Sequence, residues 1–573
     1  MAASFASLPI SVLSTIFSQL HESDHAAFQS LRSVARMCRS PSEDVVFRQI
    51  KLTGMRDIET TFLERLYVPD ETVGDKVQCI RLVPPRESPA VCEQLAALLA
   101  DRWNRLRNLQ ELRWESPHHI PPLLLTLLSG RTGMRLTYIN NNRVSYAMDK
   151  LLLSSPYLHR LEYTTLAYVP QAECASEMSE LRKCLLQARN LKTLNLRVGV
   201  LAWSPNDDYQ VGPLNLQFQS GDQFPALEEL TLDSDLQNYF PTTDHCKMWS
   251  HCMDWSRLHT LDFGFGSPIH LLEALTGRVA QLRTFKFGFW PTTQTGAASK
   301  LWNASENLGV IERFLVSIDA LQNVRLHSWD DDAMGKVRPA LLAKHGSSLR
   351  YLEAKLHKGF DTWQPEHFAA LAEKAPGLKE LRARMGLQEV KKGRKTRSIW
   401  PDVIAASDVQ NTYGVSRLKG IFSSFKKHLD ASPKPSPISP RAMSSKTLRF
   451  GHSALTSLRR LTHLHLEVIL EWDADQLISF PTPYQFGVPS IKHQFATELV
   501  LRLWENFGSD SPIEQIEIVF IAPEVSNSTK EWFYTVSKRW VKRAKDGIWE
   551  WRVVVDMREE GSNADPNNFD PFG

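Results

Sequence analysis

A short apolar pattern recurs along the chain, with hydrophobic first, fourth and sixth positions and a polar fifth position. This alternation predicts a strand whose fourth and sixth residues face a core and whose fifth faces solvent. Nine clear copies begin at Val77, Leu109, Leu158, Leu191, Leu227, Leu258, Leu282, Leu321 and Leu349. We expect a degenerate copy near Leu136 and Tyr138, and looser copies beginning at Leu378, Leu461 and Ile513.

Apolar residues at three- and four-residue spacing precede these strands, as at Val91, Leu95, Leu98 and Leu99. That spacing predicts a helix, so each repeat is a helix followed by a strand. One such repeat cannot bury its apolar face alone, whereas stacked repeats can. The pattern therefore predicts an α/β solenoid over residues 53–386, with a parallel strand ladder and helices on its convex side.

The repeat resembles the leucine-rich-repeat family in its long, irregular, helix-backed form. The resemblance covers residues 77–385 well and 455–520 loosely. Where the family commonly places Asn or Cys after the third leucine, this chain has residues such as Glu115, Thr164 and Arg197. The resemblance implies a concave face that binds a protein target.

Nine polar fifth positions form the predicted target-binding face: Arg113, Glu162, Asn195, Thr231, Asp262, Lys286, Arg325, Glu353 and Arg382. Their mixed sign favours a folded or peptide surface of complementary charge over a polyanion, so nucleic acid is not the expected partner. For any single residue of this set, an ordinary solvated strand face is the alternative interpretation.

Residues 1–52 predict a small, all-helical module. Pro9 suits the first turn of a helix, and the helix after it carries one apolar stripe formed by Leu13, Ile16, Phe17 and Leu20. A second stripe is formed by Phe28, Leu31, Val34 and Cys38. About 45 residues are too few to bury a good core, so such a module usually needs a partner surface.

This module resembles an F-box. The match rests on Leu8-Pro9, on Leu13-x-x-Ile16-Phe17-x-x-Leu20, and on Leu31-x-x-Val34 followed by Arg36-Met37-Cys38-Arg39. The sequence departs from the family at Ile10-Ser11, where an acidic residue is common, and at Phe47, where many members have tryptophan.

An F-box-like start joined to leucine-rich repeats is typical of non-catalytic substrate receptors in SCF-type (adaptor–cullin–F-box) ubiquitin ligases. The resemblance implies that exposed apolar residues dock on the adaptor subunit, and through it on a cullin. These residues are Leu8, Pro9, Leu13, Ile16, Phe17, Leu20, Leu31 and Val34. The alternative is a repeat scaffold without a ubiquitin role, in which residues 1–52 only cap the solenoid.

Residues 387–450 interrupt the repeats with 13 Lys or Arg against 4 Asp or Glu, a local charge of 13 − 4 = +9. This charge and the Ser-Pro content predict a disordered insertion, for which a solvated loop, a nuclear import signal and a nucleic-acid arm are alternatives. Residues 451–560 are interpreted as the last repeats and a C-terminal cap, with a helix near Trp532–Trp540 and a strand near Trp549–Val555. Residues 561–573 are expected to be a disordered tail.

Composition narrows the class of protein further. The 573 residues include seven cysteines, an odd number that favours free thiols in the cytoplasm or the nucleus. No apolar run is long enough to predict a membrane span. His245-Cys246 and His251-Cys252 lack the usual spacing of a structural zinc site, so we expect no metal and no cofactor. Familiar catalytic motifs are missing, and an enzyme is not expected.

Overall fold

The computed structural model describes most of the repeats and divides the chain into two compact units, Met1–Asp319 (unit 1) and Ala320–Gly573 (unit 2). The described residues are 9–23, 36–53, 64–66, 68, 73–85, 89–140, 147–166, 171–199, 215–234, 242–264, 268–288, 304–327, 335, 337–355, 363, 365–387, 458–470, 478–479, 490–491, 500–501, 503–504, 507, 511–521, 530–542 and 549–561. The predicted insertion beyond residue 387 and the predicted tail beyond residue 561 lie outside these ranges.

Unit 1 alternates helices and short strands. Its helices are α1 (Ile10–Ser23), α3 (Arg36–Arg48), α5 (Val73–Lys76), α6 (Pro89–Arg102), η2 (Trp103–Arg105), α7 (Pro122–Ser129), α8 (Lys150–Leu153), α9 (Gln171–Gln187), α10 (Thr243–Cys252), η3 (Trp255–Arg257), α11 (Ile269–Leu275) and α12 (Ala304–Val316). Its strands are β1 (Gln49–Leu52), β2 (Cys79–Leu82), β3 (Glu111–Glu115), β4 (Arg135–Asn140), β5 (Leu158–Leu166), β6 (Thr193–Gly199), β7 (Glu229–Ser234), β8 (Thr260–Asp262) and β9 (Thr284–Gly288).

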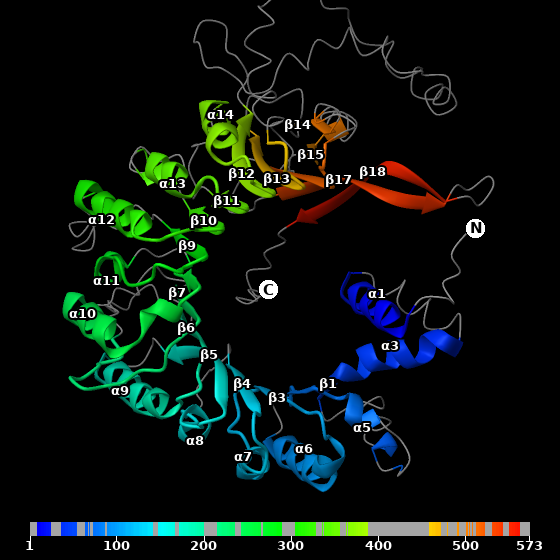
Figure 1. The fold of residues 1–573 in the computed structure, drawn as a ribbon, viewed down its shortest axis with the longest axis vertical. Coiled ribbons are helices and arrows are strands. Elements are labelled where there is room, and N and C mark those ends of the chain that lie inside the picture. The colour runs from blue at the N-terminus through cyan, green and yellow to red at the C-terminus, as the bar shows by residue number, and fades with distance from the viewer. Residues whose placement is uncertain are drawn as a thin grey trace, which may run out of the picture. The chain divides into compact units, whose positions relative to one another are not determined.

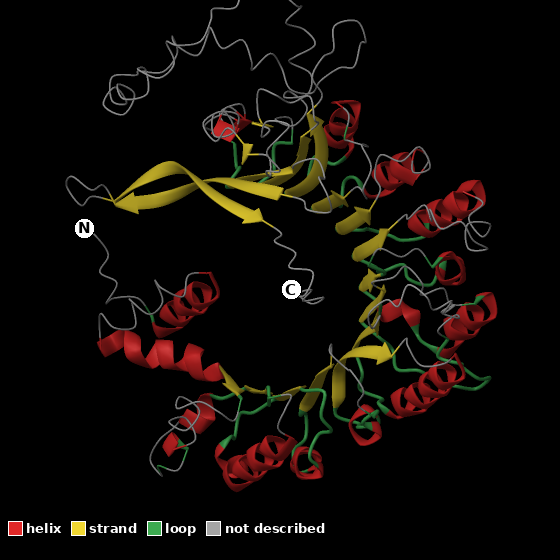
Figure 2. Ribbon diagram, turned by 180° about the vertical axis from the view of Figure 1, so that it is seen from behind, coloured by secondary structure: helices red, strands yellow, loops and turns green. Residues whose placement is uncertain are grey.

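The strands of unit 1 pair in parallel and in chain order from β1 to β9. The helices of the repeats lie on one face of this ladder (Figures 1 and 2). We call the opposite face the open face. The α/β repeat of helix and parallel strand that the sequence predicts is confirmed here.

Unit 2 begins with the same repeat and ends differently. Its elements are β10 (Asn323–His327), α13 (Val337–His345), β11 (Tyr351–Lys355), α14 (Pro365–Lys374), β12 (Glu380–Leu387), β13 (His463–Leu470), β14 (Ile478–Ser479), β15 (Ser490–Ile491), β16 (Gln515–Ile521), β17 (Lys530–Lys542) and β18 (Trp549–Gly561). Strands β10 to β13 and then β16 pair in parallel, whereas β17 and β18 add to β16 in antiparallel order. β14 and β15 form a separate antiparallel pair.

The predicted alternation along each strand is confirmed by burial. Leu194 and Leu196 on β6 are buried, and Asn195 between them is only partly covered. The preceding helices supply the other side of the core; on α12, for example, Ile311, Phe314 and Leu315 are fully buried. The apolar residues of the helices and those of the strands therefore pack against each other in one core layer between the helices and the ladder.

Backbone hydrogen bonds at the strand starts hold successive repeats in register. Lys192 N–H donates to His159 O at 2.8 Å, Glu228 N–H to Lys192 O at 2.8 Å, and His259 N–H to Glu228 O at 2.8 Å. The same type of backbone hydrogen bond occurs in unit 2, where Thr462 N–H donates to Lys379 O at 2.8 Å. Each repeat thus satisfies backbone groups of its neighbour, and these hydrogen bonds do not depend on side-chain identity.

The degenerate copy expected near Leu136 and Tyr138 exists as β4. Its pairing with β5 carries a register shift between Leu136 and Thr137, so that Leu136 lies opposite Leu158 but Thr137 lies opposite Arg160. His159 is the residue passed over. In the resulting register, Ile139 and not Thr137 lies opposite Glu162, which affects the open face described below.

Two predictions about local structure are wrong. The N-terminal module is not all-helical, because residues 49–52 form β1 and pair with β2. Its Ile50 and Leu52 therefore belong to the core of the ladder. The segment Trp532–Trp540 is not a helix but part of β17, whose buried Tyr534 and Val536 lie opposite Ile518 and Ile516 of β16. A neighbouring strand edge, which local spacing does not reveal, selects the two-residue period.

Candidate protein-binding surfaces

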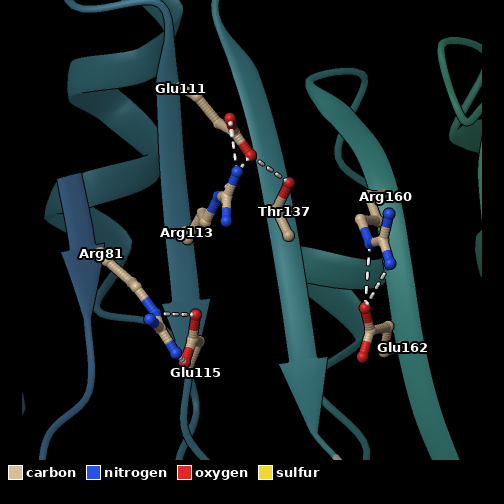
Figure 3. Close-up of polar contacts among 7 residues, drawn as sticks. All are labelled: Arg81, Glu111, Arg113, Glu115, Thr137, Arg160 and Glu162. Atoms are coloured by element: carbon tan, nitrogen blue, oxygen red, sulfur yellow. Dashed lines mark hydrogen bonds and ion pairs between the residues drawn. The ribbon is translucent and has the colours of Figure 1, made fainter. Parts of the chain in front are cut away.

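The open face of unit 1 carries a set of arginine–carboxylate pairs on β2 to β5 (Figure 3). Arg81 on β2 reaches across to Glu115 on β3, donating from Nε to Oε1 at 2.5 Å and from Nη2 to Oε2 at 2.8 Å. This two-point pairing holds the guanidinium flat along the sheet. The Glu115 side chain is mostly covered as a result, while Arg81 stays partly exposed.

A second pair lies on β3 itself. Arg113 Nε donates to Glu111 Oε1 at 2.8 Å, and the same Glu111 oxygen accepts from Thr137 Oγ1 of β4 at 2.7 Å. Burial alone raises the pKa of Glu111, but these two hydrogen bonds outweigh it and leave the pKa below its ordinary value. Glu111 is therefore held ionised between two strands.

A third pair continues the pattern on β5. Arg160 Nη2 lies 2.8 Å from Glu162 Oε1, and Arg160 Nη1 lies 3.8 Å from Glu229 Oε2 on β7. Because the carboxylates are matched locally by guanidinium groups, this part of the face presents fixed, alternating charge. Such a face suits a protein surface of complementary charge better than a uniformly charged polymer.

The register decides which of the predicted face residues lie side by side. Glu162, Asn195 and Thr231 are direct neighbours across β5, β6 and β7, and the same row continues through Asp262 and Lys286. Lys286 Nζ lies 3.4 Å from Asp262 Oδ1. These predicted residues do form one continuous row.

Arg113 lies in a different register row from Glu162. It lies opposite Thr137, which lies opposite Arg160, two residues before Glu162. The row of Glu162 continues instead into Ile139 on β4 and Glu115 on β3. The fifth positions on the two sides of this point therefore lie in different register rows, since Thr137 pairs with Arg160, two residues before Glu162.

In unit 2, Arg325, Glu353 and Arg382 are direct neighbours across β10, β11 and β12. Glu353 is only 7% exposed, which corrects the expectation that it faces solvent. Tyr351 donates its hydroxyl to Glu353 Oε2 at 2.5 Å, and Arg325 Nε lies 3.5 Å from the same oxygen. The Arg325 guanidinium also lies over the Tyr351 ring, 5.3 Å from its centroid. Arg325 and Arg382 remain exposed on this face.

One histidine, His465, continues this row among charged side chains. It was not among the predicted site residues. His465 on β13 lies between Arg382 and Glu517 in the register. Its Nδ1 is 2.7 Å from Glu517 Oε2, and its Nε2 is 3.9 Å from Glu467 Oε1. Arg384 binds Glu467 from the other side at 2.6 Å.

Burial lowers the pKa of His465, but the two nearby carboxylates, Glu467 and the hydrogen-bonded Glu517, outweigh burial and raise the pKa above the ordinary value. Both His465 and Glu517 are fifth positions of the looser copies that begin at Leu461 and Ile513. The sequence signal was therefore available in those copies, but only the register places the two side chains together.

The predicted adaptor-docking residues divide into buried and exposed groups on α1. Leu13 and Phe17 are buried and α1 packs against α3, so these two residues form the module's own core and not a free surface. Pro9 and Val12 are exposed, Val12 by 41%, and Ile16 is partly exposed. The side chain of Leu20, together with Leu8, Leu31 and Val34, lies outside the described residues.

The His–Cys pairs considered for zinc are core residues in part. His245 and Cys246 on α10 are buried, with the His245 ring stacked on Phe218 at 5.4 Å and 5.7 Å from the Trp249 ring. Burial lowers the pKa of His245 to about 4 and raises that of Cys246 to about 12. Within the described ranges, no group of three or more His, Cys, Asp or Glu side chains is placed to hold a metal ion.

Comparison with known proteins adds no relative. No protein-family model matches the chain, and no curated protein matches its sequence. Among the described helices, none combines the length and the apolar character needed to cross a membrane. The functional argument therefore rests on the residues and their geometry.

Proposed function

We propose that this chain is the non-catalytic substrate-recognition subunit of a cullin-based, SCF-type ubiquitin ligase. In this proposal the N-terminal module docks on the adaptor subunit and the open faces of the repeats bind a protein target. The role of the chain is proximity: it holds the target near a ubiquitin-charged enzyme carried by the complex.

The observation that carries the proposal is the apolar stripe that α1 leaves exposed. Pro9, Val12 and Ile16 follow one another at three- and four-residue spacing, which places them on one side of the helix. The neighbouring side of the helix is already occupied, because Leu13 and Phe17 fill the module's core. The stripe thus supports a docking surface made of Pro9, Val12 and Ile16, instead of the buried pair.

The open faces support target recognition through charge. In unit 1 the pairs Arg81–Glu115 and Arg160–Glu162 present guanidinium groups that are neutralised but still partly exposed. Such pre-ordered groups form charge-assisted hydrogen bonds with a partner at a low cost in side-chain entropy. We propose that the target is a protein surface bearing both carboxylates and basic side chains.

Co-purification of the full chain with the adaptor subunit tests the docking surface. We expect Val12→Asp and Ile16→Asp, alone or together, to abolish co-purification while the circular dichroism of the chain is unchanged. Leu151→Asp is the matched control, because Leu151 on α8 is an equally apolar side chain that is 65% exposed and lies outside α1. Full adaptor binding by a folded Val12→Asp, Ile16→Asp variant would refute the proposal.

The alternative is a repeat scaffold in which the module only caps the ladder. Several contacts tie the module to the first repeat besides the pairing of β1 with β2: Gln78 N–H donates to Arg48 O at 2.9 Å, and Lys76 Nζ lies 2.9 Å from Asp44 Oδ1 and 3.5 Å from Glu43 Oε2. Deleting residues 1–48 keeps β1 and separates the two functions. A cap's loss lowers the melting temperature of unit 1 without any effect on ubiquitin-ligase assembly, whereas loss of the docking module abolishes adaptor binding.

A further inference from the structure

One register row on the open face of unit 1 consists almost entirely of cations. It crosses β1 to β5, and each of its residues lies directly opposite the next one on the neighbouring strand. In strand order these residues, which we call the cation row, are Lys51, Arg81, Arg113, Thr137 and Arg160. Like charges on directly opposed residues are unfavourable, so the cations of such a row require anions nearby.

Carboxylates balance the three arginines of the cation row, but they are more deeply covered than the arginines. The three ion pairs are Arg81–Glu115, Arg113–Glu111 and Arg160–Glu162. In these pairs the arginine side chains are 35% to 45% exposed, whereas the carboxylate side chains are only 12% to 19% exposed. Lys51 is also exposed. A partner that approaches the row therefore meets cationic groups first, although each of the three pairs has no net charge.

The ion pairs use only part of each guanidinium group. All three arginines contact their carboxylates through Nε and Nη2, as Arg113 does with Glu111 at 2.8 and 3.3 Å (Figure 3). Within the described residues, Nη1 of Arg81 and Nη1 of Arg113 make no hydrogen bond. These Nη1 groups are held in place by the ion pairs, so they can donate to a carboxylate of a partner at a low cost in side-chain entropy.

The cation row has a definite length. Within the described residues β1 is the first strand of the ladder, and beyond Arg160 the row continues with Thr193 and the half-buried carboxylate of Glu229. The four strand intervals from Lys51 to Arg160 amount to about 19 Å, at about 4.8 Å each, whereas an extended chain rises about 3.4 Å per residue. An extended segment of about six residues therefore spans the row, and its alternate side chains, about 7 Å apart, face the row.

We infer that the cation row binds a short, extended, acidic segment of the target protein, with Asp or Glu at alternate positions. This inference rests on the proposed role of the open face in target recognition, and it names the class of segment that is recognised there. Carboxylates of the segment accept hydrogen bonds from the outward guanidinium groups and are attracted by Lys51. A long polyanion fits this surface less well, because beyond Arg160 it would meet the carboxylate of Glu229.

Fluorescence anisotropy with the full chain and short labelled peptides tests the inference at low ionic strength. The probe is a six-residue peptide in which Glu and Ser alternate, and its control is the same peptide with Gln in place of Glu. We expect the Glu peptide to bind at least about tenfold more tightly than the Gln peptide, and its affinity to fall as salt is added. Equal affinities, or no binding of either peptide, would overturn the inference. Tighter binding of a six-nucleotide single-stranded DNA than of the Glu peptide would also overturn it, in favour of a nucleic-acid surface.

Charge-neutral double variants separate the cation row from the overall charge of the chain. Arg81→Gln with Glu115→Gln removes one cation of the row together with its carboxylate, so the net charge is unchanged. We expect this variant to bind the Glu peptide about tenfold more weakly than the wild-type chain. The matched control is Lys150→Gln with Glu180→Gln, which removes an ion pair of 2.8 Å between α8 and α9, outside the row, and should bind as the wild-type chain does. Equal affinities of the two folded double variants would contradict the inference.

The two readouts distinguish failure of this inference from failure of the proposed adaptor docking. Both double variants leave α1 unchanged, so both should co-purify with the adaptor subunit as the wild-type chain does. Conversely, the Val12→Asp, Ile16→Asp variant should keep its preference for the Glu peptide. A chain that co-purifies with the adaptor but binds the Glu and Gln peptides equally would refute the acidic segment alone and leave the docking surface standing.

Discussion

The open faces of the two units differ in the acid–base chemistry of their charge pairs. On unit 1, carboxylates such as Glu115 and Glu162 are matched by arginines, which stay charged at any physiological pH. On unit 2, Glu517 is matched by His465, whose charge depends on pH. Unit 2 also has arginine pairs, at Glu353 and Glu467, and it adds a titratable pair because His465 stands at a fifth position.

The histidines of the two units differ in a second way. His245 of unit 1 is buried among aromatic rings, and its pKa is lowered to about 4. His465 of unit 2 lies between two carboxylates, and its pKa is raised despite burial. A buried histidine therefore disfavours its proton unless an anion accompanies it, and the two units have opposite pH dependence from this residue type.

Acid unfolding should show the largest difference. Below pH 6.5 the unfolded chain binds a proton at His245 that the folded chain does not bind until about pH 4. Between these values this residue removes stability from unit 1 as pH falls, by roughly 3 kcal/mol at most. We expect His245→Phe to lose that part of the pH dependence, measured by denaturant unfolding at pH 7 and pH 4.5. An identical pH dependence in His245→Phe and wild type would contradict this account.

Removal of one arginine in each unit should show an intermediate effect. Arg384→Ala leaves Glu467 mostly covered and without its closest cation, and should cost about 2 kcal/mol of unfolding free energy in unit 2. Arg81→Ala removes a more exposed partner of Glu115 in unit 1 and should cost under about 1 kcal/mol. Denaturant midpoints of both variants measure the difference. Equal losses of unfolding free energy in the two variants would show that the burial of the ion pair does not determine its contribution.

The protonation of His465 should show the smallest effect. Because its folded pKa is raised, its charged contacts add stability to unit 2 below the unfolded pKa near 6.5, and this stability is lost as pH rises through the higher folded pKa. An NMR titration should place the midpoint of His465 above that of a free histidine, while His245 titrates below it. Glu517→Gln should lower the His465 midpoint and leave His245 unchanged. A midpoint of His465 below 6.5 would show that burial outweighs the two carboxylates.

Much of the fold was predictable from hydrophobic spacing, because the burial of alternate residues is a local property of a strand. The pattern located strands as far apart as β2 and β16, and it even indicated the degenerate β4 through Leu136 and Tyr138. It failed at Trp532–Trp540, where a helical and a strand interpretation of the same apolar residues were both possible. The neighbouring edge of β16 decided between them.

The candidate surfaces were less predictable. Spacing identified Asn195, Thr231 and Asp262 as fifth positions, and the register places them in one row, but spacing gave no sign that Arg113 and Glu162 lie in different rows. The resemblance to an F-box implied a docking role for Leu13 and Phe17, although they form the core of the module, because a helical stripe does not say which of its residues a neighbouring helix covers.

The sequence by itself determined that repeats of helix and strand stack into parallel ladders, since the required burial is encoded in every repeat. Only the tertiary structure decided which charges meet. The partner of Glu111, Glu353 or His465 lies on another strand or depends on a register that no single repeat contains. The physical reason is that core burial is set by positions within one repeat, whereas the chemistry of a sheet face is set by the alignment between repeats.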